Sequence, residues 1–435
     1  MHKKLISITL VLVAGTAAVW FGMRWIRTNT AAYQPPVIAE NKTGDSPTDR
    51  QLRKGEELIK RSPDSPDGYN LLASAYMQKA RETGDFGFNA QAEAALQRSL
   101  NLRSEEYDTL RLQATLLLTF HRFAEGLEVA RKAQALRPAN ADIYGAITDA
   151  QVELGAYPEA IESAQKMMDL RPDTAAYSRV SYLRELHGDP EGAIEAMRIA
   201  VKISDPNSPE SAAWCRVHLG LQLMNVGKRD EAEHEFDAAL SGFPDYYLAL
   251  SAKAKARAAA GDTTNALELY RQAQARVPLP DVVSAYGDLL AQLGRNDEAN
   301  RQYELTEFIE RSGASASSYS RQLALYLADH GLKLDEALAI ARRERAARSD
   351  IYTCDVLAWC LYKQGLFAEA KTAMTEALRL GTKDARLYYH AGLIAERLGD
   401  RPGAQKYLGL ALRTDASFNF LQAATARRTL RELAA

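Results

Sequence analysis

A glycine followed five residues later by an alanine recurs seven times along this chain of 435 residues. The pairs are Gly155/Ala160, Gly188/Ala193, Gly227/Ala232, Gly261/Ala266, Gly294/Ala299, Gly365/Ala370 and Gly399/Ala404. The prolines Pro138 and Pro172, and again Pro244 and Pro278, lie 34 residues apart. A period of about 20 to 50 residues is the signature of stacked structural repeats, in which each unit contacts mainly its neighbours.

The segment 141–172 shows the repeating unit most clearly. Its first half places larger side chains at spacings of three and four, which predicts a helix with one buried face. Gly155 then ends this helix, because glycine enters the left-handed conformation without steric cost. A second helix starts near Pro158, where a missing N–H is tolerated, and Pro172 closes the unit. Ala160 faces the first helix, so the two backbones can approach closely.

The same face recurs after the other glycines, with side chains four and then three residues beyond the alanine, as in Ala232, Phe236 and Ala239. This pattern resembles the tetratricopeptide repeat family, whose unit is a helix–turn–helix of about 34 residues. The resemblance covers roughly residues 67–416. It implies an all-α fold, a right-handed superhelical solenoid of about ten helix pairs, with first helices lining a concave groove that binds a protein or peptide.

Some units depart from the pattern. The first carries an insertion around 83–89, and extra residues also lengthen the stretches 204–210 and 313–318. We expect longer loops there that bend the stack locally, which makes them candidate hinges.

The N-terminus has a different character from the repeats. His2-Lys3-Lys4 precedes an uncharged run over 5–23, and Arg24 and Arg27 follow it. Nineteen residues at about 1.5 Å per residue span roughly 28 Å, close to the thickness of a bilayer core. We therefore predict a transmembrane signal anchor over 1–27, so that the fold class includes an N-terminal transmembrane helix.

The remaining boundaries follow from composition and from the need to cover the ends of a stack. They are a flexible linker over 28–49, an N-terminal capping helix over 50–66, the repeat array over 67–418 and a C-terminal capping helix over 419–435. Two alternatives for the N-terminus stay open: a signal cleaved near Thr30-Ala31-Ala32, and a buried helix. The short Lys-Lys tail favours an array exported from a bacterial inner membrane to the periplasm or exterior.

Neither charge nor motifs indicate chemistry. A net charge of −2 and a pI near 6.4 give no electrostatic case for nucleic acid. The histidines show no metal-ligand spacing, and no nucleophile, phosphate-loop or dinucleotide motif is present, so we predict no metal, no cofactor and no enzyme. The three cysteines, Cys215, Cys354 and Cys360, are expected to be buried packing residues.

The expected groove changes character toward its C-terminal end. First-helix positions are small or acidic across most of the array, as at Asp149 and Asp288, and then become aromatic and basic. Aromatic residues beside arginine are typical of binding hot spots, although such rings can also fill a curved wall. The residues predicted to bind a partner are Tyr352, Asp355, Trp359, Tyr362, Arg386, Tyr389, His390 and Arg397.

The leading functional hypothesis is a membrane-tethered scaffold that organises an envelope complex by binding a protein or peptide in the groove. One alternative is an accessory subunit that docks an enzyme of polysaccharide export or cytochrome assembly. Another is a cleaved, soluble, secreted binding protein. The carboxylate clamp of cochaperones is not matched, since Asn70 stands alone, and the paired CxxC motifs of one membrane-anchored assembly factor are absent.

Overall fold

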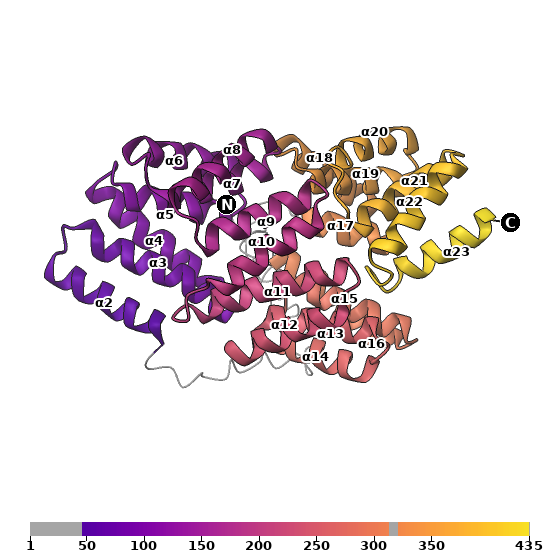
Figure 1. Cartoon of the computed structure of the whole chain (residues 1–435), viewed down its shortest axis with the longest axis horizontal. Helices are drawn as coiled ribbons and strands as arrows, with labels where there is room; N and C mark the ends of the chain where they lie inside the picture. Colours follow the sequence, from indigo (N-terminus) through magenta and orange to yellow (C-terminus); the bar gives the residue numbers. More distant parts are fainter. Residues whose placement is uncertain (1–45, 313–320, 435) are drawn as a thin grey trace, which may run out of the picture. The chain divides into compact units, whose positions relative to one another are not determined.

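The computed structural model describes residues 46–312 and 321–434, which form 22 helices and no strand. Ten consecutive helix pairs make up the array (Figure 1). The pairs are α3 (Pro66–Thr83) with α4 (Gly87–Leu102), α5 (Tyr107–Thr119) with α6 (Phe123–Leu136), α7 (Ala141–Glu153) with α8 (Tyr157–Leu170), α9 (Thr174–Leu186) with α10 (Pro190–Lys202), α11 (Pro209–Asn225) with α12 (Arg229–Gly242), α13 (Tyr247–Ala259) with α14 (Thr263–Arg276), α15 (Pro280–Gln292) with α16 (Asn296–Ser312), α17 (Arg321–His330) with α18 (Leu334–Ala347), α19 (Ile351–Lys363) with α20 (Phe367–Ala377), and α21 (Ala385–Arg397) with α22 (Arg401–Thr414).

One further helix flanks the array at each end: α2 (Pro47–Arg61) precedes the first pair and α23 (Gln422–Ala434) follows the last. The all-α solenoid is therefore confirmed. No described helix has both the length and the apolar character needed to cross a bilayer. The predicted span at 5–23, most of the linker and the Gly/Ser stretch at 313–318 lie outside the described residues, and the anchor stays a prediction.

The glycine–alanine pattern shapes each helix pair. Gly155 and Gly365 both have φ of 78°, the left-handed conformation that ends the first helix of a pair. In the second pair His121 takes this position with φ of 58°. Ala160 and Ala232 are completely buried where the two helices of a pair cross. These residues therefore permit the tight turn and the close approach that the period predicts.

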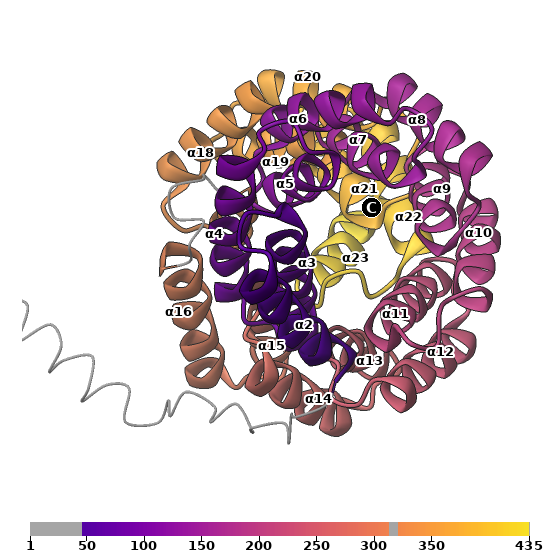
Figure 2. The same ribbon diagram turned by 90° about the vertical axis from the view of Figure 1, so that its left-hand side faces the viewer.

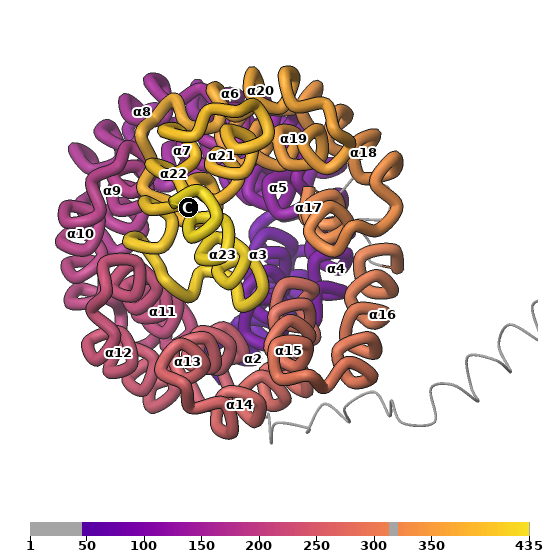
Figure 3. Tube along the Cα trace, turned by 90° about the vertical axis from the view of Figure 1, so that its right-hand side faces the viewer, coloured from indigo at the N-terminus to yellow at the C-terminus, as the bar shows by residue number. Residues whose placement is uncertain are grey.

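The pairs coil around a common axis, with first helices inside and second helices outside (Figures 2 and 3). We call the inward-facing surface of the first helices the inner wall. Successive coils touch, because Ser349 Oγ donates a 2.9 Å hydrogen bond to Leu154 O and the Ile351 amide donates a 2.9 Å bond to the Tyr157 hydroxyl. These partners are 195 and 194 residues apart. One coil therefore takes roughly five to six helix pairs.

Candidate binding site on the inner wall

Trp359 is the centre of an aromatic cluster on the inner wall. Its indole stacks between Tyr362 and His390, whose ring centroids lie 4.8 and 4.1 Å away at interplanar angles of 5° and 13°. The indole Nε1 donates a 2.7 Å hydrogen bond to Asp329 Oδ1 in α17. Because His390 belongs to α21 and Trp359 to α19, the cluster joins three consecutive first helices.

Charged groups continue from this cluster along α19 and α21. His390 Nδ1 lies 2.8 Å from Asp355 Oδ1, and both side chains are fully buried. Arg386 Nε lies 3.7 Å from Asp355 Oδ2, and its guanidinium lies over the ring of Tyr352 at 5.9 Å. Asp355 Oδ2, Arg386 Nε and His390 Nε2 have no hydrogen-bond partner among the described residues. Buried polar atoms usually have partners, so these three retain bonding capacity.

The eight predicted partner-binding residues differ in accessibility. Asp355, Trp359, Tyr389 and His390 are buried, since consecutive first helices pack closely around them. The other four residues are Tyr352, Tyr362 and Arg386, which are half-buried, and Arg397, which is exposed. The buried four thus fill the curved wall, which is the alternative to partner contact that the sequence left open. Only the accessible four can contact a partner directly. Partner binding by these eight residues stays a prediction.

The C-terminal part of the chain crosses this wall. We call residues 415–422, which link α22 to α23 and include the first residue of α23, the tail segment. Asp415 Oδ2 lies 3.1 Å from Lys255 Nζ in α13, Asn419 Nδ2 donates a 3.0 Å hydrogen bond to Asp288 Oδ2 in α15, and Gln422 Nε2 donates a 2.7 Å bond to Asp329 Oδ1. Seen from the C-terminal end in Figure 3, α23 overlaps the opening of the ring, and Figure 1 shows it extending past the last helix pairs. The sequence offered one unused signal for this contact, the aromatic–amide–aromatic run Phe418-Asn419-Phe420.

Two carboxylates of the inner wall are perturbed by burial. Burial raises the pKa of Asp288 to about 6, although hydrogen bonds from Tyr303 and Asn419 favour its charged form. Burial also raises the pKa of Asp329, against the opposing influence of His390 and the Trp359 indole. Both carboxylates thus depend on donors, because an unpaired buried charge is costly.

A second part of the inner wall holds a cavity of about 500 Å³. Helices α5, α7 and α9 of one coil line it together with α17 and Arg348 of the next coil. Its arginines are paired: Arg179 donates two bonds to Asp149, of 2.9 and 2.6 Å, and Arg348 lies 2.6 Å from Glu153. Of these two ion pairs, Arg179–Asp149 lies within one coil, and Arg348–Glu153 joins one coil to the next across 195 residues.

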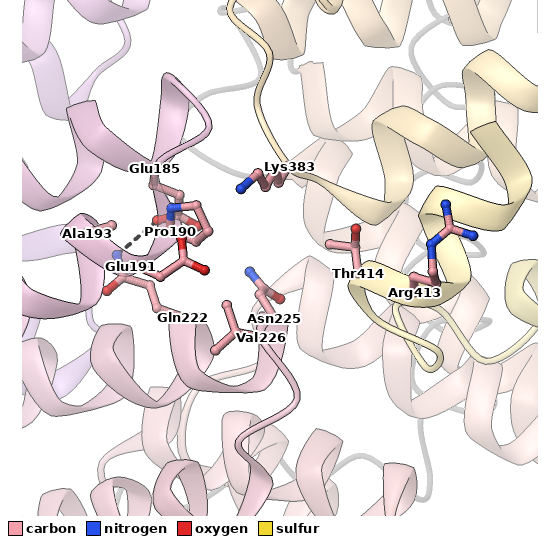
Figure 4. A pocket seen from close by; sticks show the side chains of 10 residues that line it. All are labelled: Glu185, Pro190, Glu191, Ala193, Gln222, Asn225, Val226, Lys383, Arg413 and Thr414. Atoms are coloured by element: carbon pink, nitrogen blue, oxygen red, sulfur yellow. Dashed lines mark hydrogen bonds between the residues drawn. The ribbon is translucent and has the colours of Figure 1, made fainter. Parts of the chain in front are cut away.

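A smaller cavity, of about 190 Å³, lies where α9, α10 and α11 face the turn before α21 and the end of α22. Figure 4 shows Glu185 and Glu191 on one side of it and Lys383 and Arg413 on the other. Burial raises the pKa of Glu185, opposed by a hydrogen bond from Gln222. The opposite charges on the two walls favour the contact between coils.

The described part of the chain gives little support for a metal site or a reactive thiol. Across residues 46–312 and 321–434, no group of three or more histidine, cysteine or acidic side chains could hold a metal ion. Cys215, Cys354 and Cys360 are buried free thiols, as expected. Burial raises the pKa of Cys215 and of Cys360 to about 12, so both are inert thiols at neutral pH.

Comparison with known proteins gives the same picture of the fold. A family model for the tetratricopeptide repeat matches residues 111–175, 218–279 and 356–418. A search of curated proteins finds no match. Solved structures with a similar fold include a human IFIT1 dimer with PPP-AAAA, which is 16% identical with a TM-score of 0.49 and covers 76% of this chain and 77% of its own.

Two further solved structures also match the chain. The Cut9–Hcn1 hetero-tetramer of APC/C is 15% identical, covers 88% of this chain and 92% of its own, and has a TM-score of 0.34. YrrB, described as a TPR protein with an unusual peptide-binding site, is 20% identical, covers 41% of this chain and 91% of its own, and has a TM-score of 0.29. With TM-scores below 0.5, these likenesses carry no argument about the function of this chain.

The fold and the inner wall together define a helical-repeat scaffold of the kind suited to protein interaction, and no enzyme family is indicated. The three matched regions fall within the helix pairs of a single repeat type. These three regions of the chain are tetratricopeptide repeats.

Proposed function

We propose that this protein is a membrane-tethered scaffold that holds a polypeptide segment of a partner along its inner wall and so organises a complex in a bacterial envelope. The anchor is supported by the apolar run at 5–23 and its flanking charges. The short Lys-Lys tail before that run supports an exported array, periplasmic or extracellular.

One observation carries the binding role. The inner wall already holds an irregular stretch of polypeptide, the tail segment, through side-chain contacts on three first helices. A surface that accommodates its own chain in this way has the spacing of donors, acceptors and apolar contacts that another segment requires. The half-buried side chains of Tyr352 and Arg386 extend this surface toward the last repeats.

The experiment is site-specific photo-crosslinking of the full chain in intact membranes. A photoreactive phenylalanine replaces Tyr352 on the inner wall, and in a matched control it replaces Phe308, an aromatic side chain of α16 that is 63% exposed. We expect a defined partner protein to crosslink from position 352 and not from 308. Products from 308 alone would place the partner on the outer face and refute the groove.

The tether is tested separately by sequencing the N-terminus of the mature protein. An intact N-terminus is expected for an anchor, whereas a chain that begins near Tyr33 would establish the cleaved, soluble form. Protease added to spheroplasts is expected to digest the array, and full protection would refute its export. Recovery of one defined enzyme as the crosslinked partner would favour the accessory-subunit alternative.

A further inference from the structure

We propose that the stretch of inner wall around Asp288 and Asp329 is a binding site for a polypeptide segment in which amide side chains alternate with aromatic ones. The tail segment occupies this site until such a partner displaces it. The inference rests on the proposed function, since it names the kind of segment that the array holds.

The register of the tail segment on the wall supports this assignment. Its residues 415, 419 and 422 meet α13, α15 and α17 in order, so that each contact falls on the first helix of the next repeat. The contacted residues lie 160, 131 and 93 positions earlier in the chain. A helix that only capped the last repeat would need contacts with α22 alone. The tail segment instead follows the repeat spacing as a ligand would.

The two carboxylates explain why amide side chains suit the site. Asp288 accepts a 2.9 Å hydrogen bond from the hydroxyl of Tyr303, and Asp329 accepts its 2.7 Å bond from the Trp359 indole. Each carboxylate therefore has one donor built into the wall and takes its other donor from the occupant. Asp288 is buried, so an occupant that leaves its Oδ2 without a donor is disfavoured. At Asp329, which is half-buried, the occupant's donor adds to the indole bond on the same Oδ1.

Aromatic side chains flank these amides. Phe420 packs against the apolar cluster that contains Tyr270 and Leu289, and the ring of Phe418 lies 5.5 Å from that of Tyr389. Both phenylalanines remain only partly buried. The site thus offers one apolar contact on each side of an amide position, and this arrangement sets the aromatic–amide–aromatic pattern.

The tail segment can leave the wall without unfolding. Asp415 Oδ1 accepts bonds from the backbone amide and the hydroxyl of Ser417, and Asn419 Oδ1 accepts from the backbone amides of Leu421 and Gln422. These local bonds shape the segment and cap α23 whether or not the wall is occupied. The ion pair of Asp415 with Lys255, the two amide nitrogens and the two rings have to separate from the wall.

The experiment measures binding of a labelled peptide with the sequence of residues 415–434 to the full chain, by fluorescence anisotropy. In wild type the resident tail competes, so we expect weak binding. In the double variant Asn419→Ala/Gln422→Ala the tail loses its bonds to both carboxylates, and we expect the peptide to bind at least about tenfold more tightly. Adding Asp288→Asn and Asp329→Asn to this variant is expected to reverse the gain.

Gln97→Ala is the matched control, because Gln97 is an exposed amide whose bond goes to Asn101 on the same helix. It should bind the peptide as wild type does. The proposal is overturned if the double variant, with its helical circular dichroism unchanged, shows no gain over Gln97→Ala, or if the carboxylate substitutions leave the gain intact. A concentration-dependent dimer of the double variant that is dissolved by the peptide would also overturn it, in favour of a second copy as the occupant.

These results separate the inference from the function on which it rests. If the peptide binds as expected but no partner crosslinks at position 352, the site stands and the scaffold role fails. If a partner crosslinks at 352 equally in wild type and in the double variant, and the peptide does not compete with it, the scaffold role stands and this inference fails.

Discussion

Replacing Gly188 by alanine tests whether contacts between coils hold the array in its tight superhelix. Gly188 has φ of 73°, and an alanine Cβ there would lie 2.4 Å from the backbone oxygen of Gly381 in the next coil. Gly365 offers a matched control, since its φ is 78° but no atom lies within 4 Å of an added Cβ. The two substitutions share the cost of the left-handed conformation and differ only in the clash between coils.

The magnitudes follow from this difference. A left-handed alanine costs about 1–2 kcal/mol, which is the whole expected effect of Gly365→Ala. In Gly188→Ala the neighbouring coil must also move away, because the added Cβ clashes with a backbone oxygen, which cannot rotate aside as a flexible side chain could. That movement breaks the buried hydrogen bond from the Thr382 hydroxyl to Leu186 O, and leaving such groups unpaired costs about 1–3 kcal/mol more. We therefore expect about 2–5 kcal/mol in total.

Hydrogen exchange of the full chain, purified in detergent, is the suitable assay, because a solenoid need not unfold in one step. Gly188→Ala should lower the protection of amides in 381–388 as well as in 183–189, whereas Gly365→Ala should affect only the amides near its own turn. Small-angle scattering should show a larger radius of gyration for Gly188→Ala alone. Equal losses of protection in the two variants, or an unchanged radius, would refute the idea that this contact closes the coil.

Three further predictions concern the wall and one helix pair. Trp359→Phe keeps the ring stack but removes the indole hydrogen bond, so thermal denaturation should show a loss of about 1–3 kcal/mol; no loss would contradict the role of that bond. The pKa of Asp288 is about 6 in the folded protein, against an ordinary value of 3.8. The protonated carboxyl group therefore stabilises the fold below pH 3.8, and this stabilisation is lost as pH rises through 6. Asp288→Asn should therefore remove up to about 3 kcal/mol of the fall in stability over this range, measured by denaturation against pH, and an unchanged slope would refute the shift. Gly220→Ala places a Cβ 2.3 Å from the ring of Phe236 and should destabilise the protein by about 1–3 kcal/mol. Gly242→Ala, with nothing within 4 Å of its Cβ, should leave the stability unchanged or raise it. Urea denaturation measures both, and the opposite order of stabilities would contradict the packing.

Much of the fold could be predicted from the sequence because repeat contacts are local. The spacing from Gly155 to Ala160 specifies a turn and a helix crossing, and both are made within one pair. The same locality brings Asp355, Trp359 and His390 together, because they lie on adjacent first helices. Their burial was the harder part to predict, since helical spacing does not say how closely two neighbouring helices pack.

The contacts between coils could not be predicted from the period. The pitch of a superhelix is the sum of small rotations at each repeat, and no residue pattern encodes that sum directly. The bond from Ser349 to Leu154, across 195 residues, depends on this pitch. The bond from Gln422 to Asp329, across 93 residues, lies within one coil and depends on the curvature that the same rotations produce. For this reason the sequence predicted a helix at the C-terminus but not the wall that the preceding segment occupies.

The glycines of the pattern have two different roles that the sequence alone cannot separate. At Gly227, Gly261 and Gly294 an added Cβ would meet nothing within 4 Å, so the left-handed turn is the sole requirement there. At Gly155 and Gly188 the same turn also faces the backbone of the next coil, and the missing side chain lets the coils touch. Because α21 and α22 belong to that next coil, its closure also places the start of the tail segment within reach of α13. Occupation of the inner wall by the tail therefore depends on glycines that lie more than 200 residues earlier in the chain.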